Sequence, residues 1–199
     1  MKQIQDHYFK KAQKEGYPAR SVYKLEEAQD KYRFLKNGDK VLDLGCQPGS
    51  WSMYAGQIVG PTGLIVGIDL HGGRVNRKGQ SAEIKVLKGD IYNIESLDAL
   101  KEICPEYSAV ISDMAPHTTG NKWSDQQQSI NLSRRALELA DMLLIEGGSF
   151  YCKVFEGEDF KEFVDNVRKF FKKVQVVKPK SSRKESREVF ILGLGFFRQ

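Results

Sequence analysis

Residues 41–51 have the sequence Val-Leu-Asp-Leu-Gly-Cys-Gln-Pro-Gly-Ser-Trp, an apolar run with one acid, followed by two glycines and a proline. A short apolar run bounded by turn residues predicts a buried strand. Gly45 and Gly49 let the backbone turn tightly, and Ser50 is a candidate N-cap for a helix that begins at Trp51. Such loops lie at the carboxyl edge of a sheet, where open α/β folds bind their ligands.

The glycine spacing of this loop argues against two common phosphate sites. The pattern Gly45-x-x-x-Gly49 lacks the third glycine of the dinucleotide fingerprint, and no Gly-Lys-Ser/Thr follows to hold a triphosphate. An acid before the first glycine suits a cationic or hydroxyl-rich ligand better than a pyrophosphate. By itself, the loop is compatible with a nucleoside-type site and with an ordinary strand-to-helix turn.

The composition predicts one globular domain. The chain has 199 residues and 40% hydrophobic content, enough for a single well-packed core. We therefore expect one domain over residues 1–199, with residues 1–36 as a helical extension packed on it. The sequence has no run of about 18 apolar residues and no apolar signal core, so we expect a cytoplasmic protein that is not bound to a membrane. Its three cysteines and three histidines show no ligand spacing, so we expect neither disulfides nor a metal site.

The net charge of +5 is unevenly distributed along the chain. Residues 1–40 hold ten Lys/Arg and six Asp/Glu, residues 41–167 hold eleven and eighteen, and residues 168–187 hold nine and one, which gives +4, −7 and +8. Basic segments on both sides of an acidic centre are typical of an enzyme that binds a polyanion. A solvated basic surface is the alternative for the C-terminal run.

The remaining periodicity predicts alternating strands and helices. Strands are expected at 41–44, 64–69, 84–87, 108–112, 149–152, 174–177 and 189–194, and helices at 5–15, 22–32, 51–59, 95–103, 125–145 and 160–171. The last helix has one apolar face, made by Phe160, Phe163, Val164, Val167, Phe170 and Phe171. No helix separates the last two strands, so they should pair as an antiparallel hairpin. These elements predict an α/β fold with a mostly parallel seven-stranded sheet, an antiparallel last strand and helices on both faces.

This topology brings chemically active residues to one edge of the sheet. Parallel strands place their carboxyl ends together, and the reversed last strand begins where the others end. The residues gathered there are Asp43, Asp69, Asp90, Asp113, Lys153 and Glu188. A single polar residue at a strand end is often only a cap or a surface salt bridge. Acids and lysines that lie close together shift one another's pKa values, and such shifts are typical of functional sites.

Five sequence motifs, in order, resemble the FtsJ-type ribosomal RNA 2′-O-methyltransferases of the bacterial and organellar large-subunit kind. The motifs are Ser21-Val22-Tyr23-Lys24-Leu25, Leu42–Gly45 with Pro48–Trp51, Ser112–Pro116, Gly147–Phe150 with Lys153–Phe155, and Lys178–Pro179 with Ser181–Arg183 and Ser186–Glu188. The resemblance spans residue 6 to the C-terminus. It implies a Rossmann-like fold and transfer of a methyl group from S-adenosylmethionine to a ribose 2′-hydroxyl, that of a uridine in large-subunit ribosomal RNA.

The resemblance also assigns roles to individual residues. The catalytic set is Lys24, Asp113, Lys153 and Glu188, of which Lys24 is placed by the resemblance alone. The cofactor set is Asp43, Gly45, Pro48, Gly49, Trp51, Asp69, Leu70, Asp90, Ile91 and Asp113. Cys46-Gln47 departs from the usual family pattern, which leaves the specificity contacts open. For RNA we expect basic contacts from Lys10, Lys11, Lys14, Arg20, Arg33, Lys180, Arg183, Lys184 and Arg187.

The role of Lys153 and the identity of the substrate stay open at this stage. Lys153 is a candidate general base, but an unperturbed lysine is protonated at neutral pH, and a charged lysine would orient the hydroxyl instead. The expected partner is ribosomal RNA, within the large ribosomal subunit, and the enzyme is expected to be a monomer. Transfer RNA and messenger-RNA cap are alternative substrates. A nicotinamide dehydrogenase and a non-catalytic RNA-binding module are the other functional classes.

Overall fold

The computed structural model describes residues 2–76, 79–116, 119–183 and 185–198, which form seven strands and six helices. The strands are β1 Lys40–Leu44, β2 Leu64–Asp69, β3 Glu83–Lys88, β4 Tyr107–Ser112, β5 Leu144–Phe155, β6 Phe171–Val177 and β7 Glu188–Phe196. The helices are α1 Lys2–Lys14, α2 Val22–Tyr32, α3 Ser50–Val59, α4 Ile94–Ile103, α5 Lys122–Leu143 and α6 Phe160–Arg168.

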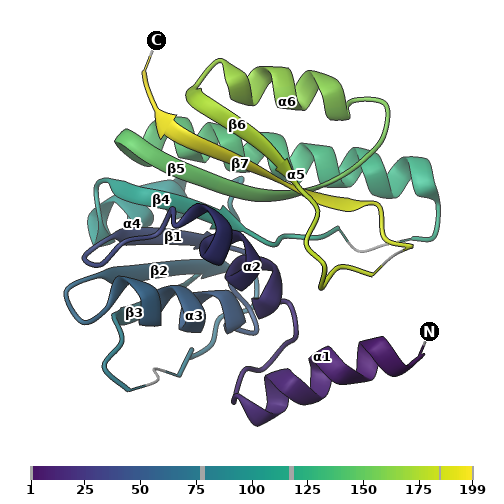
Figure 1. Cartoon of the computed structure of the whole chain (residues 1–199). Helices are drawn as coiled ribbons and strands as arrows, with labels where there is room; N and C mark the ends of the chain where they lie inside the picture. Colours follow the sequence, from purple (N-terminus) through teal and green to yellow (C-terminus); the bar gives the residue numbers. More distant parts are fainter. Residues whose placement is uncertain (1, 77–78, 117–118, 184, 199) are drawn as a thin grey trace.

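The strands form a single sheet in the order β3-β2-β1-β4-β5-β7-β6 (Figure 1). Neighbouring pairs from β3 to β5 are parallel, whereas β7 is antiparallel to both β5 and β6. Phe155 at the end of β5 pairs with Glu188 at the start of β7. The predicted mostly parallel sheet with an antiparallel last strand is confirmed.

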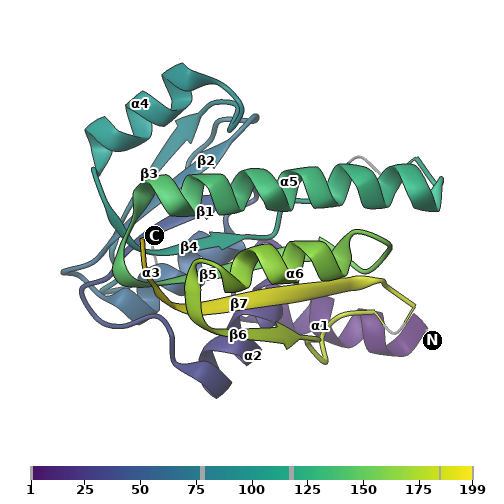
Figure 2. The same ribbon diagram turned by 90° about the horizontal axis from the view of Figure 1, so that it is seen from above.

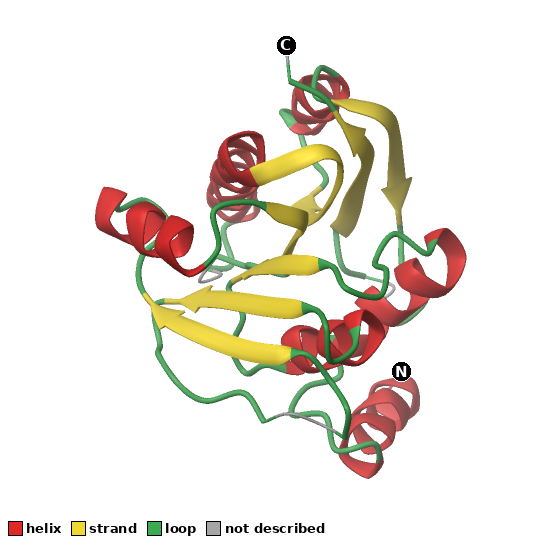
Figure 3. Ribbon diagram, turned by 90° about the vertical axis from the view of Figure 1, so that its left-hand side faces the viewer, coloured by secondary structure: helices red, strands yellow, loops and turns green. Residues whose placement is uncertain are grey.

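Helices cover both faces of the sheet and bury a separate core on each. One core joins the sheet to α4, α5 and α6, and the other joins it to α1, α2 and α3. Figure 2 and Figure 3 show the two helical layers on opposite sides of the strands. The second core is rich in aromatic rings: Tyr151 stacks on Trp51 at 5.6 Å and on Phe190 at 4.9 Å between ring centroids, and Trp51 and Phe190 are 5.8 Å apart. It joins α3, β5 and β7 directly beneath the carboxyl edge of the sheet.

Several element boundaries differ from the sequence prediction. Ser50 is the first residue of α3 and not its N-cap, and its hydroxyl bonds the backbone of Ala19 instead. Phe171, predicted on the last helix face, is the first residue of β6, because the chain turns at Lys169–Phe170. Lys153 lies inside β5, which continues to Phe155. Each difference arises from tertiary contacts that local periodicity does not contain.

Candidate active site

The strand order places a crevice between β1 and β4. The chain leaves β1 for β2 on one side and later returns to β4 on the other, so the connecting segments diverge at this point. In open α/β sheets such a switch point is where ligands bind, outside the carboxyl ends of the strands. Asp43 lies in β1, and Asp113 directly follows β4. The acids that the sequence predicts at this edge therefore flank the crevice.

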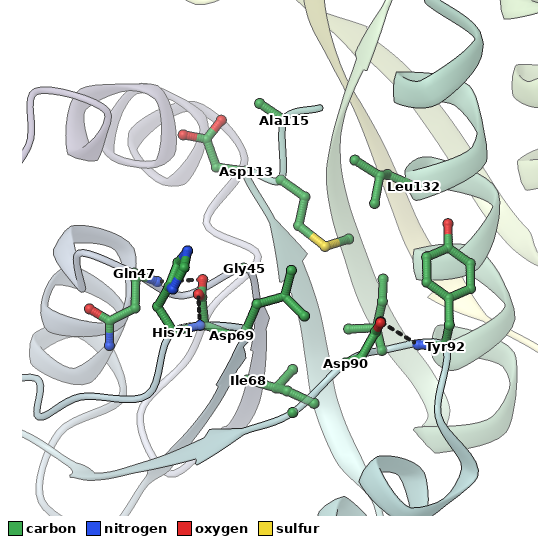
Figure 4. Close-up of a pocket in the computed structure, with 14 residues that line it drawn as sticks. Gly45, Gln47, Ile68, Asp69, His71, Asp90, Tyr92, Asp113, Ala115 and Leu132 are labelled. Carbon is green, nitrogen blue, oxygen red and sulfur yellow. Dashed lines mark hydrogen bonds between the residues drawn. The ribbon is translucent and has the colours of Figure 1, made fainter. Parts of the chain in front are cut away.

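A pocket of about 430 Å³ opens at this edge (Figure 4). Six predicted cofactor residues line it, namely Gly45, Asp69, Leu70, Asp90, Ile91 and Asp113. The sequence analysis missed Gln47, Ile68, His71, Gly89, Tyr92, Met114, Ala115 and Leu132. Most of these adjoin a predicted residue along the chain, and adjacency could have suggested them. Leu132 comes from the middle of α5 and has no sequence signal.

Two acids of the pocket are fixed by backbone N–H groups. Asp69 accepts from the N–H of Gln47 at 3.2 Å on one oxygen and from the N–H of His71 at 2.8 Å on the other. Asp90 accepts from the N–H of Tyr92 at 3.0 Å. Figure 4 shows these two carboxylates at the ends of neighbouring strands, with Asp113 at the margin of the pocket and turned away from both. The pocket thus presents oriented hydrogen-bond acceptors beside apolar walls.

Gly45 makes the close approach of the loop to β4 possible. Its φ is +72°, and a Cβ at this position would lie 2.5 Å from Cγ of Met114. A larger residue would be strained by the backbone and would collide with the pocket wall. The glycine is therefore required by the tertiary packing as well as by the turn.

The four predicted catalytic residues lie together at one point of this edge. Nζ of Lys153 donates to the backbone oxygen of Asp113 at 2.6 Å and pairs with its Oδ1 at 3.0 Å. Nζ of Lys24 pairs with the same Oδ1 at 3.5 Å and with Oε2 of Glu188 at 3.0 Å. The side chains are 6–17% exposed, so water screens these charges less than at an open surface.

Lys24 reaches the cluster because α2 is tied to the sheet. The indole N–H of Trp51 donates to the backbone oxygen of Ser21 at 2.9 Å, and the hydroxyl of Tyr151 donates to the backbone oxygen of Lys24 at 3.0 Å. Val22 and Leu25 are fully buried in the core below. Trp51, predicted as a cofactor contact, thus also packs in the core and positions α2.

Asp43 lies beneath the glycine loop and is buried, at 1% exposure. Its Oδ2 accepts from the Ser52 hydroxyl at 2.6 Å. Its pKa is raised to about 7, mainly by burial and in smaller part by the nearby carboxylates of Asp113 and Asp69, while the Ser52 hydrogen bond opposes the shift. Asp43, Pro48 and Trp51 line a second hollow of about 40 Å³ next to the 430 Å³ pocket. Gly49, also predicted as a cofactor contact, is not among the residues that line either hollow.

The predicted RNA contacts are spread over several surfaces. Arg20 and Arg183 share one pocket beside Lys24 and Glu188. Lys11 pairs with Glu15 and Glu26, each at 3.7 Å, and lies over the Tyr23 ring. Arg33 is the C-cap of α2. Exposed positions are held by Lys10, Lys14, Lys180 and Arg187, and Lys184 lies outside the described residues.

The described ranges show neither a metal site nor a membrane-spanning helix. Within them, no group of three or more His, Cys, Asp and Glu side chains is arranged to hold a metal ion. Among the helices of the same ranges, none combines the length and apolar character needed to cross a membrane.

Comparison with known sequences identifies close relatives. Residues 17–196 match the FtsJ-like methyltransferase family. The ribosomal RNA large subunit methyltransferase E of Desulfotalea psychrophila is 52% identical over 196 residues, which are 98% of each chain. The protein of the same name from Desulfatibacillum aliphaticivorans is 46% identical, over 94% of this chain and 89% of its own.

Two solved structures share the fold. A Plasmodium falciparum ribosomal RNA methyltransferase structure has a TM-score of 0.78 at 28% identity, covering 92% of this chain and 100% of its own. Fibrillarin from Aeropyrum pernix, solved with natively bound S-adenosyl-L-methionine, has a TM-score of 0.62 at 18% identity, covering 87% and 76%. The second likeness concerns the fold alone.

The sheet order, the switch-point pocket and these relatives define the class of the protein as a Rossmann-like methyltransferase. Within that class, the chain belongs to the FtsJ-like methyltransferase family. The predicted family and enzyme class are confirmed, and neither the dehydrogenase nor the non-catalytic alternative agrees with this membership.

Proposed function

We propose that this enzyme methylates a ribose 2′-hydroxyl in large-subunit ribosomal RNA, with Lys24, Asp113, Lys153 and Glu188 as its catalytic residues. The observation that carries the proposal is the joint ion-pair network of these four side chains, centred on Oδ1 of Asp113 and placed beside the switch-point pocket. The names of the relatives support ribosomal RNA over transfer RNA or a messenger-RNA cap. We further propose that residues 1–199 act as one cytoplasmic, monomeric domain on a ribosomal particle.

The pocket residues fit S-adenosylmethionine, the cofactor of this class. The fixed carboxylates of Asp69 and Asp90 offer acceptors for ribose hydroxyls and for an adenine amino group. Ile91 and Leu132 offer an apolar wall for an adenine ring, and Gly45 allows close approach of the backbone. When bound, S-adenosylmethionine supplies an electrophilic methyl group on a sulfonium.

The four proposed catalytic residues Lys24, Asp113, Lys153 and Glu188, called the tetrad from here on, would hold the acceptor hydroxyl. Two of the contacts of Lys153 Nζ are to Asp113, which fixes the amine at the crevice. This leaves a third N–H of an ammonium to orient the hydroxyl, or the lone pair of a neutral amine to take its proton. Lys24 also pairs with Asp113, and Glu188 pairs with Lys24 in turn. Alignment of this kind can lower a barrier by about 7–11 kcal/mol, so positioning can supply much of the catalysis.

Replacement of Lys153 tests the assignment. We expect Lys153→Ala to lower kcat by at least about 10²-fold, because loss of a proton-transfer or orienting group has this size. Affinity for S-adenosylmethionine should stay near wild type, which also verifies folding. The measurement is transfer of a labelled methyl group to ribosomal RNA, with nuclease digestion to locate the label on a 2′-oxygen.

Lys101→Ala is the matched control, because Lys101 lies in the last turn of α4, away from the tetrad. It should retain wild-type turnover. Wild-type methylation by Lys153→Ala, or label on a base in place of a 2′-oxygen, would contradict the proposal.

A further inference from the structure

A second pocket adjoins the tetrad. It has a volume of about 250 Å³ and is lined by Arg20, Ser21, Lys24, Arg183, Ser186 and Glu188. Lys24 and Glu188 belong to the tetrad, and none of the six residues lines the cofactor pocket. We call this hollow the basic pocket. The tetrad therefore has the cofactor pocket beside Asp113 and the basic pocket beside Lys24 and Glu188.

The positive charges of the basic pocket outnumber the negative charges among the residues that line it. Three cations, Arg20, Lys24 and Arg183, face the single carboxylate of Glu188, which gives a formal charge of +2. Lys24 is paired with Glu188 at 3.0 Å and with Asp113 at 3.5 Å. Within residues 2–76, 79–116, 119–183 and 185–198, neither guanidinium has a salt bridge or a side-chain hydrogen bond. Two unpaired guanidinium groups in one hollow are suited to an oxyanion, which they bind with planar, forked N–H donors.

The two walls of the basic pocket are fixed relative to each other. Arg20 lies two residues before the start of α2, and Arg183 lies in the loop between β6 and β7. The carboxylate of Glu27, on α2, accepts from the backbone N–H groups of Lys180 and Ser181 in that loop, at 2.6 and 2.9 Å. Nζ of Lys178 also donates to the backbone oxygens of Ser186 and Glu188, both at 2.6 Å. The site is thus preorganised, which lowers the entropy cost of binding.

We propose that the basic pocket binds one phosphodiester of the RNA, the one next to the ribose that is methylated. The inference rests on the proposed transfer to a 2′-hydroxyl. The carbon that bears this hydroxyl is bonded to the carbon that bears the 3′-phosphate, so a ribose at the tetrad brings a phosphate into its immediate surroundings. A phosphate held by Arg20 and Arg183 fixes the ribose at the tetrad without reading the base.

The salt dependence of RNA binding tests this site without turnover. The variants are Arg20→Gln, Arg183→Gln and the double variant, each with S-adenosylmethionine affinity as the check of folding. The slope of log affinity against log salt should become less steep by about 0.7–0.9 in each single variant, the value of one phosphate contact. The double variant should lose no more than either single variant, because the two guanidinium groups share one phosphate. KM for RNA should rise in all three.

Arg168→Gln is the matched control, because Arg168 ends α6 and pairs with Asp165 at the surface. It should keep the wild-type slope. Unchanged slopes in both single variants would overturn the site, and additive losses in the double variant would overturn the shared phosphodiester. If the wild-type enzyme puts no methyl group on a 2′-oxygen, the proposed function fails, and the slopes separately report whether the pocket holds an RNA phosphate.

Discussion

At the scale of single residues, four acids at one sheet edge have four different environments. Asp43 is buried with one hydroxyl donor, and Asp69 accepts two backbone N–H groups. Asp90 accepts one such group and faces the pocket, while Asp113 contacts the amino groups of both Lys24 and Lys153. The sequence presents all four alike, as an acid at the end of a strand. Their surroundings in the structure give them different roles. Asp43 supports the loop from below, Asp69 and Asp90 are acceptors in the pocket, and Asp113 is the centre of the tetrad.

Asp43 should make stability depend on pH. Its pKa of about 7 in the folded protein exceeds the ordinary value of about 3.9, so between these values the folded state keeps a proton that the unfolded state has lost. The free energy of unfolding should therefore fall as pH rises through this window, by on the order of 4 kcal/mol, and level off above it.

Urea unfolding of wild type and Asp43→Asn across this pH range measures the effect. The asparagine does not titrate, so its stability relative to wild type should increase from acid to neutral pH. Asp98→Asn, on the exposed face of α4, should follow the wild-type curve. Parallel curves for wild type and Asp43→Asn would show that Asp43 does not titrate in this way.

At the scale of elements, the tetrad depends on how α2 and the β6–β7 loop are held. Lys24 comes from α2, and Glu188 comes from the strand that this loop leads into. Glu27 joins the two elements through two charge-assisted hydrogen bonds. Because Glu27 lies outside the basic pocket, it acts as a positioning residue for the acceptor side of the site.

Glu27→Gln should loosen this loop. The amide offers one acceptor oxygen in place of two, so one charge-assisted bond of about 1.5 kcal/mol is lost and kcat/KM for RNA should fall about tenfold. Trypsin should cleave faster after Lys180 or Arg183, since the loop opens more often. Affinity for S-adenosylmethionine should not change.

Glu102→Gln on α4 removes an equal charge far from the loop and should match wild type in both assays. Unaltered kcat/KM and cleavage rate in Glu27→Gln would mean that the loop is held by other contacts.

At the scale of the whole molecule, the donor and acceptor sides are separate hollows that meet at Asp113 and its partners. The cofactor pocket is built from the β1, β2, β3 and β4 ends with α5, and the basic pocket from the segment before α2 and the β6–β7 loop. The acidic middle of the sequence forms the first, and the two basic ends supply the second. The uneven charge along the chain therefore places acidic residues at the cofactor pocket and basic residues at the basic pocket.

This separation predicts that the two affinities can be changed independently. Asp69→Ala should weaken binding of S-adenosylmethionine about 10- to 100-fold, because it removes a charged hydrogen-bond acceptor. Its affinity for RNA should equal that of wild type. Calorimetric titration of the cofactor and filter binding of RNA measure the two constants, with Asp98→Ala as the control. A parallel loss of RNA affinity would contradict separate hollows.

The sequence by itself determined the alternation of strands and helices, the reversed last strand and the acids at the strand ends. These features follow from local periodicity and from parallel pairing, so residues near one another in the chain suffice to predict them. The motif resemblance added Lys24, which precedes the sheet and has no topological reason to approach Asp113.

Only the tertiary structure decided which side chains meet. It joined Lys24 to Glu188 across 164 positions, bonded the indole of Trp51 to the backbone just before α2, and brought Leu132 into the pocket. It also selected Arg20 and Arg183 from a longer run of basic candidates and placed them in one hollow. Contacts of this kind depend on how whole helices and loops dock on the sheet, and that docking is set by the packing of both cores together.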